Sequence, residues 1–263
     1  MTLISSRNNP NVKLARALRQ KKARQESGLF VVEGIRPVGE AVEASAGIEA
    51  IFYSPEILHS EFAEELIRVQ QDKGVNCLGL TAEVFASIAD KENPQGILAL
   101  VKQDLKKLEP LNPSNFPWGV GLVAPQDPGN LGTILRSIDA VGASGLILLD
   151  SSLDVYHPSA VRASMGSLFW YPVVDALFLE FVEWSRRNHY TIYGTSAHAS
   201  LDYRQVDEYV SPRILLMGSE RQGLSSDQMD TCDVLIRLPM HGRATSLNLA
   251  VATGVMLYAM LAQ

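Results

Sequence analysis

Three short polar segments of the sequence carry side chains that can do chemistry. They are residues 125–132, 218–225 and 239–248. Their candidate groups are Asn130 with Arg136 just beyond it, Glu220 between two glycines, and Ser246 with Asn248. Glycines leave backbone N–H and C=O groups open to a ligand, and amide, hydroxyl, carboxylate and guanidinium groups bind polar edges or stabilise developing charge. Together the three segments predict a cofactor pocket.

Each segment taken alone also fits an ordinary strand-to-helix turn. Asn130 would then cap one helix, and Thr245 or Ser246 would cap another. Glu220 would be a solvated carboxylate. The segment around it nearly matches the phosphate-binding pattern GxxxxGK[ST], but Leu224 occupies the lysine position. Without that ammonium group the phosphates of a nucleoside triphosphate lose their main charge partner, so an NTPase is disfavoured.

The elements that must position these segments follow an α/β pattern. Apolar runs that alternate with helical periodicity predict a covered, mainly parallel sheet, and ligands collect at the carboxyl ends of such strands. In the C-terminal part the runs are Val120–Ala124, Gly145–Leu149, Thr191–Tyr193, Ile214–Met217 and Val234–Leu238, followed by an apolar helix at Leu249–Leu261. In the N-terminal part they are Leu29–Glu33, Ile48–Tyr53, Val75–Leu80 and Ile97–Val101.

The length of 263 residues suits two domains. Pro110, Pro113 and Pro117 stand in a polar stretch that neither a helix nor a central strand would tolerate. We therefore expect a smaller domain at residues 1–105, a linker at 106–117 and a second domain at 118–263.

The charge is distributed unevenly along the chain. The net charge is −6, but the first 30 residues hold seven basic residues and one acidic residue, a balance of +6 that leaves −12 for the rest. Asn9-Pro10 predicts the start of an amphipathic basic helix. Its basic face is either a surface for nucleic-acid phosphates or a solvated helix face.

Several functional classes are disfavoured by composition. The 46% of hydrophobic residues indicates folded cores, yet no apolar run is long enough to span a membrane and the N-terminus lacks the apolar stretch of a signal peptide. We therefore expect a cytoplasmic protein. Cys77 and Cys232 lack CxxC spacing and no HExxH occurs, so neither a disulfide nor a metal site is expected.

The quoted segments resemble the three ordered motifs of SpoU-class RNA ribose methyltransferases. The motifs are PGNLGTILRS at 128–137, LLMGSERQGLS at 215–225 and IRLPMHGRATSLNLAVATG at 236–254. Tyr156-His157-Pro158 and residues 161–167 resemble the family's segment between the first two motifs, and residues 6–10 and 30–36 resemble its substrate-binding domain. The resemblance thus spans nearly the whole chain.

The resemblance implies a fold, a cofactor and partners. It implies a C-terminal α/β methyltransferase domain with a deep trefoil knot, and a smaller N-terminal α/β RNA-binding domain like certain ribosomal proteins. It further implies S-adenosylmethionine bound in the knot loops, a homodimer through the C-terminal domains, and methylation of a ribose 2′-hydroxyl. Ribosomal RNA is favoured over tRNA, because tRNA-directed relatives often have only short terminal extensions.

The resemblance also assigns residues by motif position. The catalytic candidates are Asn130, Arg136, Glu220, Ser246 and Asn248. The cofactor-binding candidates are Thr195, Ser196, Met217, Gly218, Ile236, Leu238 and Leu247. The cations expected to contact RNA are Arg7, Lys13, Lys21, Lys22, Arg24, Arg36 and Arg162. One departure from the pattern is Arg221-Gln222, where many relatives have a glycine directly after the glutamate, and this change bears on substrate fit.

Three rival interpretations remain open. A noncatalytic RNA-binding or ribosome-assembly protein would be expected to lack Arg136, Glu220 or Asn248, and all three are present. A nucleotide-dependent oxidoreductase should carry GxGxxG after its first strand, and no such pattern occurs. The same methyl transfer to tRNA is the closest alternative.

Overall fold

The structure, a computed structural model, describes residues 3–262 and divides into two compact units. Unit 1 contains the chain up to Asp104 together with Asp154–Trp170. Unit 2 contains Leu105–Leu153 and the chain from Tyr171 onward. A segment in the middle of the sequence therefore packs with the N-terminal residues.

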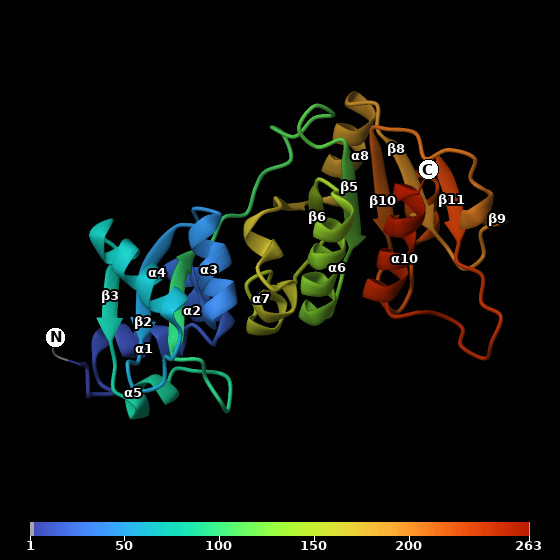
Figure 1. The fold of residues 1–263 in the computed structure, drawn as a ribbon. Helices are drawn as coiled ribbons and strands as arrows, with labels where there is room; N and C mark the ends of the chain where they lie inside the picture. The colour runs from blue at the N-terminus through green and yellow to red at the C-terminus, as the bar shows by residue number, and fades with distance from the viewer. Residues whose placement is uncertain (1–2, 263) are drawn as a thin grey trace. The chain divides into compact units, whose positions relative to one another are not determined.

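Unit 1 is built on a four-stranded mixed sheet (Figure 1). Its strands are β1 (Leu29–Glu33), β2 (Ile48–Tyr53), β3 (Asn76–Gly79) and β4 (Ile97–Lys102), in the order β1-β4-β2-β3. Strand β4 is antiparallel to β1 and β2, and β3 is parallel to β2. Its helices are α1 (Pro10–Ala17), α2 (Lys21–Ser27), α3 (Ile35–Glu43), α4 (Glu61–Asp72), α5 (Ala82–Ala86) and α7 (Pro158–Ser164), with a 3-10 turn η1 (Ser167–Phe169).

The basic N-terminal helix predicted from Asn9-Pro10 is confirmed as α1. The Asn9 side chain accepts a hydrogen bond from the Asn11 N–H at 2.9 Å, and Pro10 fills the first helical position, where no N–H is needed. Val12 and Ala15 are buried on one side of the helix. The basic residues then continue into α2, so the positive charge is spread over two short helices.

Unit 2 is built on a seven-stranded sheet whose neighbouring strands are all parallel, in the order β7-β6-β5-β10-β8-β11-β9. The strands are β5 (Trp118–Val123), β6 (Gly145–Leu149), β7 (Val173–Ala176), β8 (Thr191–Thr195), β9 (Leu201–Asp202), β10 (Arg213–Met217) and β11 (Val234–Arg237). The helices are α6 (Pro128–Val141), α8 (Phe178–Arg187), α9 (Ser226–Met229) and α10 (Leu249–Leu261), with a 3-10 turn η2 (Tyr203–Gln205). The predicted α/β fold with a parallel sheet is confirmed.

The strand order has a switch point at β5 and β10. From β5 the sheet extends through β6 and β7 on one side, and through β10, β8, β11 and β9 on the other. Figure 1 labels all of these strands except β7. All six residues of β5 are buried, as parallel strands covered on both faces require. Loops that leave the carboxyl ends of strands diverging at such a point form a crevice, which is where ligands bind in open α/β sheets.

The proline-rich segment 106–117 is not a free connection in the structure. Leu108 and Phe116 are buried in the core of unit 2, and the Trp184 indole N–H donates to the Leu111 carbonyl at 2.9 Å. Prolines remove backbone donors but leave apolar side chains free to pack, so this irregular stretch joins the core. The sequence boundaries 1–105 and 118–263 likewise differ from the packed units, because Asp154–Trp170 belongs to unit 1.

Candidate active site

The first candidate loop leads from β5 into α6. The Asp127 carboxylate caps α6 by accepting a hydrogen bond from the Gly129 N–H at 2.7 Å, and Pro128 occupies the first turn. Asn130, considered from the sequence as a possible cap, lies instead inside the first turn and is 8% exposed. Its side chain is therefore free for a role other than capping.

The second loop places Glu220 against the start of α6. The Glu220 carboxylate accepts hydrogen bonds from the Gln126 N–H at 3.1 Å and the Asp127 N–H at 3.3 Å, and from the Asn130 side-chain amide at 3.3 Å. A helix N-terminus carries partial positive charge, which favours a carboxylate there. Glu220 is thus held in place rather than being a freely solvated side chain.

Gly218 and Gly223 shape the turn that presents Glu220. The N–H of Gly223 donates to the Ser219 carbonyl at 2.9 Å, and the Ser219 N–H donates back at 3.2 Å. A Cβ atom on Gly218 would lie 2.0 Å from the Gly223 carbonyl carbon, so no larger residue fits. Arg221 and Gln222 occupy the tip of this turn and are exposed.

The third loop joins this network through Asn248. The Asn248 side-chain oxygen caps α10 by accepting from the Ala250 N–H at 2.9 Å, and its amide nitrogen donates to the Asn130 side-chain oxygen at 2.9 Å. Because the Asn248 oxygen is committed to backbone donors, its NH₂ group must face Asn130, and the Asn130 NH₂ group must then face Glu220. The three side chains form one chain of oriented hydrogen bonds.

The other two catalytic candidates are not linked to this chain. Arg136 lies on α6 and is exposed, and its side chain forms no hydrogen bond or ion pair with the residues the structure describes. Ser246 is exposed and lines the cavity described next. The site therefore combines three fixed side chains with two that remain available to a substrate.

A cavity of about 430 Å³ lies within unit 2, beside the Glu220 turn. Six of the seven predicted cofactor-binding residues line it: Thr195, Ser196, Met217, Gly218, Leu238 and Leu247. Ile236 does not, because it is fully buried in β11, where its carbonyl accepts from the Ser196 N–H at 3.0 Å. Further lining residues include His198, Met229, Met240, Leu249 and Ala252. No sequence pattern identifies these side chains as lining residues, since they reach the cavity only after folding.

The loop 239–247 has backbone groups without partners in the described protein. Within residues 3–262, the backbone of 239–247 makes no hydrogen bond to another part of the protein. Met240 and residues 245–247 of this loop line the cavity, and 245–247 are exposed, so a ligand with polar edges can replace water as the partner of their backbone groups.

The two cysteines are inert: burial raises the pKa of Cys77 to about 11 and of Cys232 to about 12, so both thiols are protonated near neutral pH.

Most of the predicted RNA-contacting cations are exposed in unit 1. Exposed positions are Arg7, Lys13, Lys21, Lys22, Arg36 and Arg162. Several of them form ion pairs, such as Arg7 with the exposed Glu83 at 2.9 Å and Arg36 with the half-buried Glu40 at 3.6 Å. Exposed ion pairs such as Arg7–Glu83 contribute little to stability.

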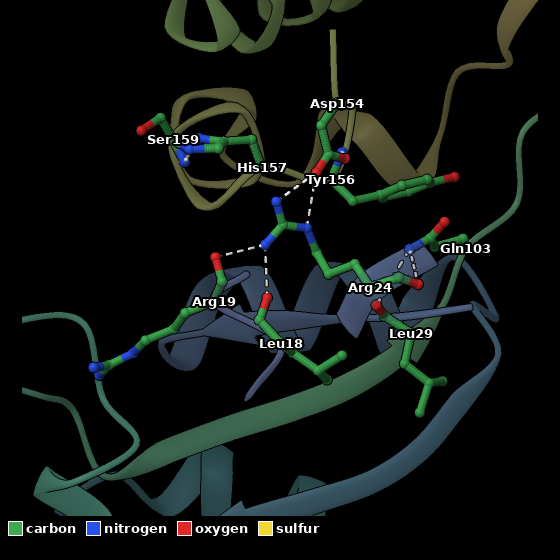
Figure 2. Close-up of polar contacts among 9 residues, drawn as sticks. All are labelled: Leu18, Arg19, Arg24, Leu29, Gln103, Asp154, Tyr156, His157 and Ser159. Carbon is green, nitrogen blue, oxygen red and sulfur yellow. Dashed lines mark hydrogen bonds and ion pairs between the residues drawn. The ribbon is translucent and has the colours of Figure 1, made fainter. Parts of the chain in front are cut away.

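Arg24 is the exception and its predicted role is corrected. It is 2% exposed, and its guanidinium donates to the Asp154 carboxylate and to the carbonyls of Leu18 and Arg19 at 2.7 and 2.8 Å (Figure 2). A guanidinium this buried is not accessible to an RNA phosphate. Arg24 therefore holds α1, α2 and the Asp154–Trp170 segment together, because a buried cation must be paired and hydrogen-bonded.

The parallel sheet, its switch point and the polar cavity define an α/β domain that binds a small cofactor at its strand ends. Residues 118–258 match the SpoU rRNA Methylase family, and residues 9–99 match the MRM3-like substrate binding domain. The chain belongs to the SpoU rRNA methylase family. The resemblance found in the three motifs, and the class of enzyme it implied, are thereby confirmed.

Three relatives are similar over nearly their whole length. The 23S rRNA (uridine(2479)-2′-O)-methyltransferase of Streptomyces viridochromogenes is 34% identical, over 97% of this chain and 90% of its own. The 23S rRNA (guanosine(2553)-2′-O)-methyltransferase RlmP of Bacillus subtilis is 30% identical, over 98% of both chains. The crystal structure of an AdoMet-bound rRNA methyltransferase from Sinorhizobium meliloti has a TM-score of 0.89 and 36% identity, covering 98% of this chain and 97% of its own.

Proposed function

We propose that this protein transfers a methyl group from S-adenosylmethionine to a ribose 2′-hydroxyl of 23S-type ribosomal RNA. The observation that carries the proposal is the Glu220–Asn130–Asn248 chain of hydrogen bonds beside the unit 2 cavity. Two 23S rRNA 2′-O-methyltransferases resemble the chain from end to end, which supports this substrate over tRNA.

The cavity fits the cofactor chemically. Its volume of about 430 Å³ is in the range of small-molecule sites, and Met217, Leu238 and Leu247 supply apolar surface for a flat ring. Thr195, Ser196 and the open backbone groups of 239–247 supply polar partners for adenine and ribose edges. S-adenosylmethionine, when bound, supplies a methyl group already activated by its sulfonium.

The fixed side chains of this site orient the loops that surround the reaction. Glu220 clamps the turn after β10 to the start of α6, and Asn248 ties the start of α10 to Asn130. These hydrogen bonds fix the three loops relative to one another. The site therefore acts by positioning the 2′-hydroxyl in line with the transferred methyl group rather than by activating it with a strong base.

Arg136 acts on the substrate by charge. A guanidinium stays protonated in proteins, so a general-base role is disfavoured. Its exposed side chain instead binds the target phosphate and stabilises the 2′-oxygen as that oxygen takes the methyl group and releases its proton to solvent water. Ser246, which lines the cavity, is placed to hydrogen-bond the ligand.

The test is ribose-methylation mapping by mass spectrometry of rRNA and tRNA from cells with and without the gene. We expect one missing 2′-O-methyl group in 23S-type rRNA, restored by the purified protein with S-adenosylmethionine. A 2′-O-methyl group missing from tRNA instead would identify tRNA as the substrate. Unchanged marks in both pools, with no binding of S-adenosylmethionine, would support a noncatalytic RNA-binding protein instead.

Unit 1 is proposed to bind the RNA, as a domain related to RNA-binding ribosomal proteins. The exposed cations on α1 and α2 support this role. The protein is proposed to act in the cytoplasm. Replacing both Lys13 and Lys22 with alanine should flatten the dependence of RNA affinity on salt, because each lost phosphate contact lowers the log–log slope by roughly 0.7 to 0.9. An unchanged slope would show that these residues do not contact the RNA.

None of the helices in residues 3–262 is long and apolar enough to cross a membrane.

The trefoil knot and the homodimer are proposed for unit 2. The sheet order, in which β10 lies between β5 and β8, supports a threaded C-terminal region. For the dimer, α10 presents Val251, Val255 and Tyr258 with exposures of 53%, 37% and 57%, an apolar face on a helix that also packs against α6. Light scattering should give a dimer mass, and Val255→Glu should shift it to the monomer.

A further inference from the structure

A second cavity lies wholly within unit 1. Its volume is about 220 Å³, the size of a ring rather than of a whole nucleotide. Its apolar walls come from Leu18, Val31, Pro37, Ile88, Pro158, Val161 and Met165. Leu18, Ile88 and Val161 are at most 5% exposed, so these walls are fixed by the core. The cavity exists because α7 packs with β1 in this unit.

One edge of the cavity is polar and incompletely paired. The Glu33 carboxylate accepts a hydrogen bond from the Asp90 N–H at 2.7 Å through Oε2, while Oε1 is buried without a partner in residues 3–262. Gln95 also lines the cavity, and its Oε1 accepts from the Ile35 N–H at 3.0 Å, which turns its NH₂ group to other acceptors. A buried carboxylate oxygen without a donor is costly, so this edge suits a ligand with N–H groups.

Four cations surround the same cavity: Arg19, Arg36, Lys91 and Arg162. Arg36 and Arg162 are 71% and 51% exposed, and their partners are the half-buried Glu40 carboxylate and the exposed Asp90 carboxylate. The two guanidinium groups are therefore accessible to a phosphate. An apolar slot, a polar edge and a positive rim match the three parts of a nucleotide: base, base edge and phosphate.

We propose that this cavity binds a guanine base extruded from single-stranded RNA. The proposal rests on the RNA substrate inferred above and adds a recognition site apart from the methyl-transfer cavity. Guanine alone presents two adjacent donors, N1–H and the 2-amino group, to a carboxylate, with the O6 acceptor beside them for Gln95 or a cation. Adenine and cytosine place an acceptor next to their donor, and uracil has a single donor between two acceptors, so each would face the Glu33 carboxylate less well.

The first experiment titrates the full-length protein with GMP, AMP, CMP, UMP and IMP by calorimetry. S-adenosylhomocysteine is kept saturating so that the unit 2 cavity is occupied. We expect GMP to bind at one site per chain, at least tenfold more tightly than the other four. IMP lacks only the 2-amino group, and the loss of one charge-assisted hydrogen bond predicts its tenfold weaker binding. Equal affinities for all five nucleotides would overturn the proposal.

A matched pair of variants assigns the preference to Glu33. Glu33→Gln should remove the difference between GMP and IMP, because the amide places a donor against the base. Glu43→Gln, an exposed carboxylate on α3 outside the cavity, should keep the wild-type difference. Should Glu33→Gln unfold, the comparison of GMP with IMP on the wild-type protein still decides whether the cavity recognises the 2-amino group of guanine. A tenfold preference that persists in folded Glu33→Gln would contradict the site.

The RNA form of the ligand is tested with labelled seven-nucleotide single strands. We expect UUUGUUU to bind more tightly than GMP and to lose at least tenfold on replacement of its guanosine by inosine, with a salt dependence that GMP lacks. RNA binding no tighter than GMP would identify a free nucleotide as the ligand and overturn the RNA part. Methyl transfer and cofactor binding are measured separately. A failure of guanine binding therefore leaves the proposed methyltransferase activity intact, and a failure of methyl transfer leaves the nucleotide titration interpretable.

Discussion

The two units each contain a polar network, and the two networks differ in what they leave available. In unit 1 the Arg24 guanidinium is 2% exposed and its donors are satisfied by Asp154 and two carbonyls. In unit 2 the Glu220–Asn130–Asn248 chain lies at exposed loops, beside a cavity and near unpaired groups. The first network is closed within the protein, while the second fixes loops and leaves neighbouring groups for a ligand.

Charge type alone therefore does not separate structural from functional residues. Both networks contain a carboxylate that accepts several hydrogen bonds. A residue that is buried and fully paired within the protein is structural, because its removal leaves a desolvated partner without a hydrogen-bond donor. Partial exposure with spare donors or acceptors makes it available to a substrate. Four predictions test this contrast, in order of decreasing effect.

Removing the buried cation should have the largest effect. Arg24→Ala leaves the Asp154 carboxylate and two carbonyls without their donor, and we expect the free energy of unfolding of unit 1 to fall by about 3–5 kcal/mol. Urea denaturation followed by tryptophan fluorescence and circular dichroism measures it. Lys22→Ala, an exposed neighbour that pairs with Glu26 at 3.8 Å, should change stability by less than about 0.5 kcal/mol. Equal losses in the two variants would mean that Arg24 is not structural.

Removing the exposed cation of the active site should act on rate and not on stability. Arg136→Ala is expected to lower kcat by about 10²–10³-fold, or roughly 2.7–4 kcal/mol, because the substrate oxygen loses its stabilising charge. S-adenosylmethionine binding and thermal unfolding should stay at wild-type values. Arg136→Lys, which keeps the charge, should recover part of the rate. A fully active Arg136→Ala variant would exclude this residue from the reaction.

Weakening the loop clamp should affect cofactor affinity. Glu220→Gln loses the charge in its hydrogen bonds with the N–H groups of Gln126 and Asp127, and we expect S-adenosylmethionine to bind about tenfold more weakly. Asp227→Asn, another exposed acid in unit 2, is the control and should bind as the wild type does. Unchanged affinity in Glu220→Gln would show that the clamp does not shape the cavity.

The smallest effect concerns alkaline stability. Burial raises the pKa of Tyr156 in unit 1 to about 12, and that of Tyr190 in unit 2 to about 12. The unfolded phenol titrates near 10, so stability is complete below about pH 10 and is lost as the pH rises through 12. Tyr156→Phe and Tyr190→Phe should each make this decline shallower by up to about 1.4 kcal/mol per pH unit, each in its own unit. A decline as steep as in the wild type would place the ionisation elsewhere.

Much of the architecture was predictable because it depends on local pattern. Apolar runs separated by helical periodicity gave the central strands of unit 2, and Asn9-Pro10 gave the start of α1. The three loops of the candidate site follow from those strands, because the carboxyl ends of parallel strands meet at one edge. The Asp127 cap was also readable from its place before Pro128, although Asn130 was considered for that role.

What the sequence could not predict depends on contacts between distant residues. Arg24 looks like its exposed neighbours Lys21 and Lys22, and its partner Asp154 is 130 positions away. The alternation of side chains along β11 turns the Ile236 side chain into the core, so its assignment to the cofactor pocket, which rests largely on backbone contacts, stays a prediction. The short strands β7 and β9 lie outside the predicted set, because four and two residues are too few for a periodic signal.

The packing of Asp154–Trp170 with unit 1 has a consequence for how the chain can be divided. The polypeptide passes between the units after Asp104, after Leu153 and after Trp170, so three covalent connections join them. A fragment that begins near residue 118 would keep α7 but lose the surface that buries Tyr156, Val161 and Leu168. Exposed apolar surface of this kind promotes aggregation. Unit 2 is therefore not modular, and gene truncation or fusion at the proline-rich stretch should yield insoluble protein.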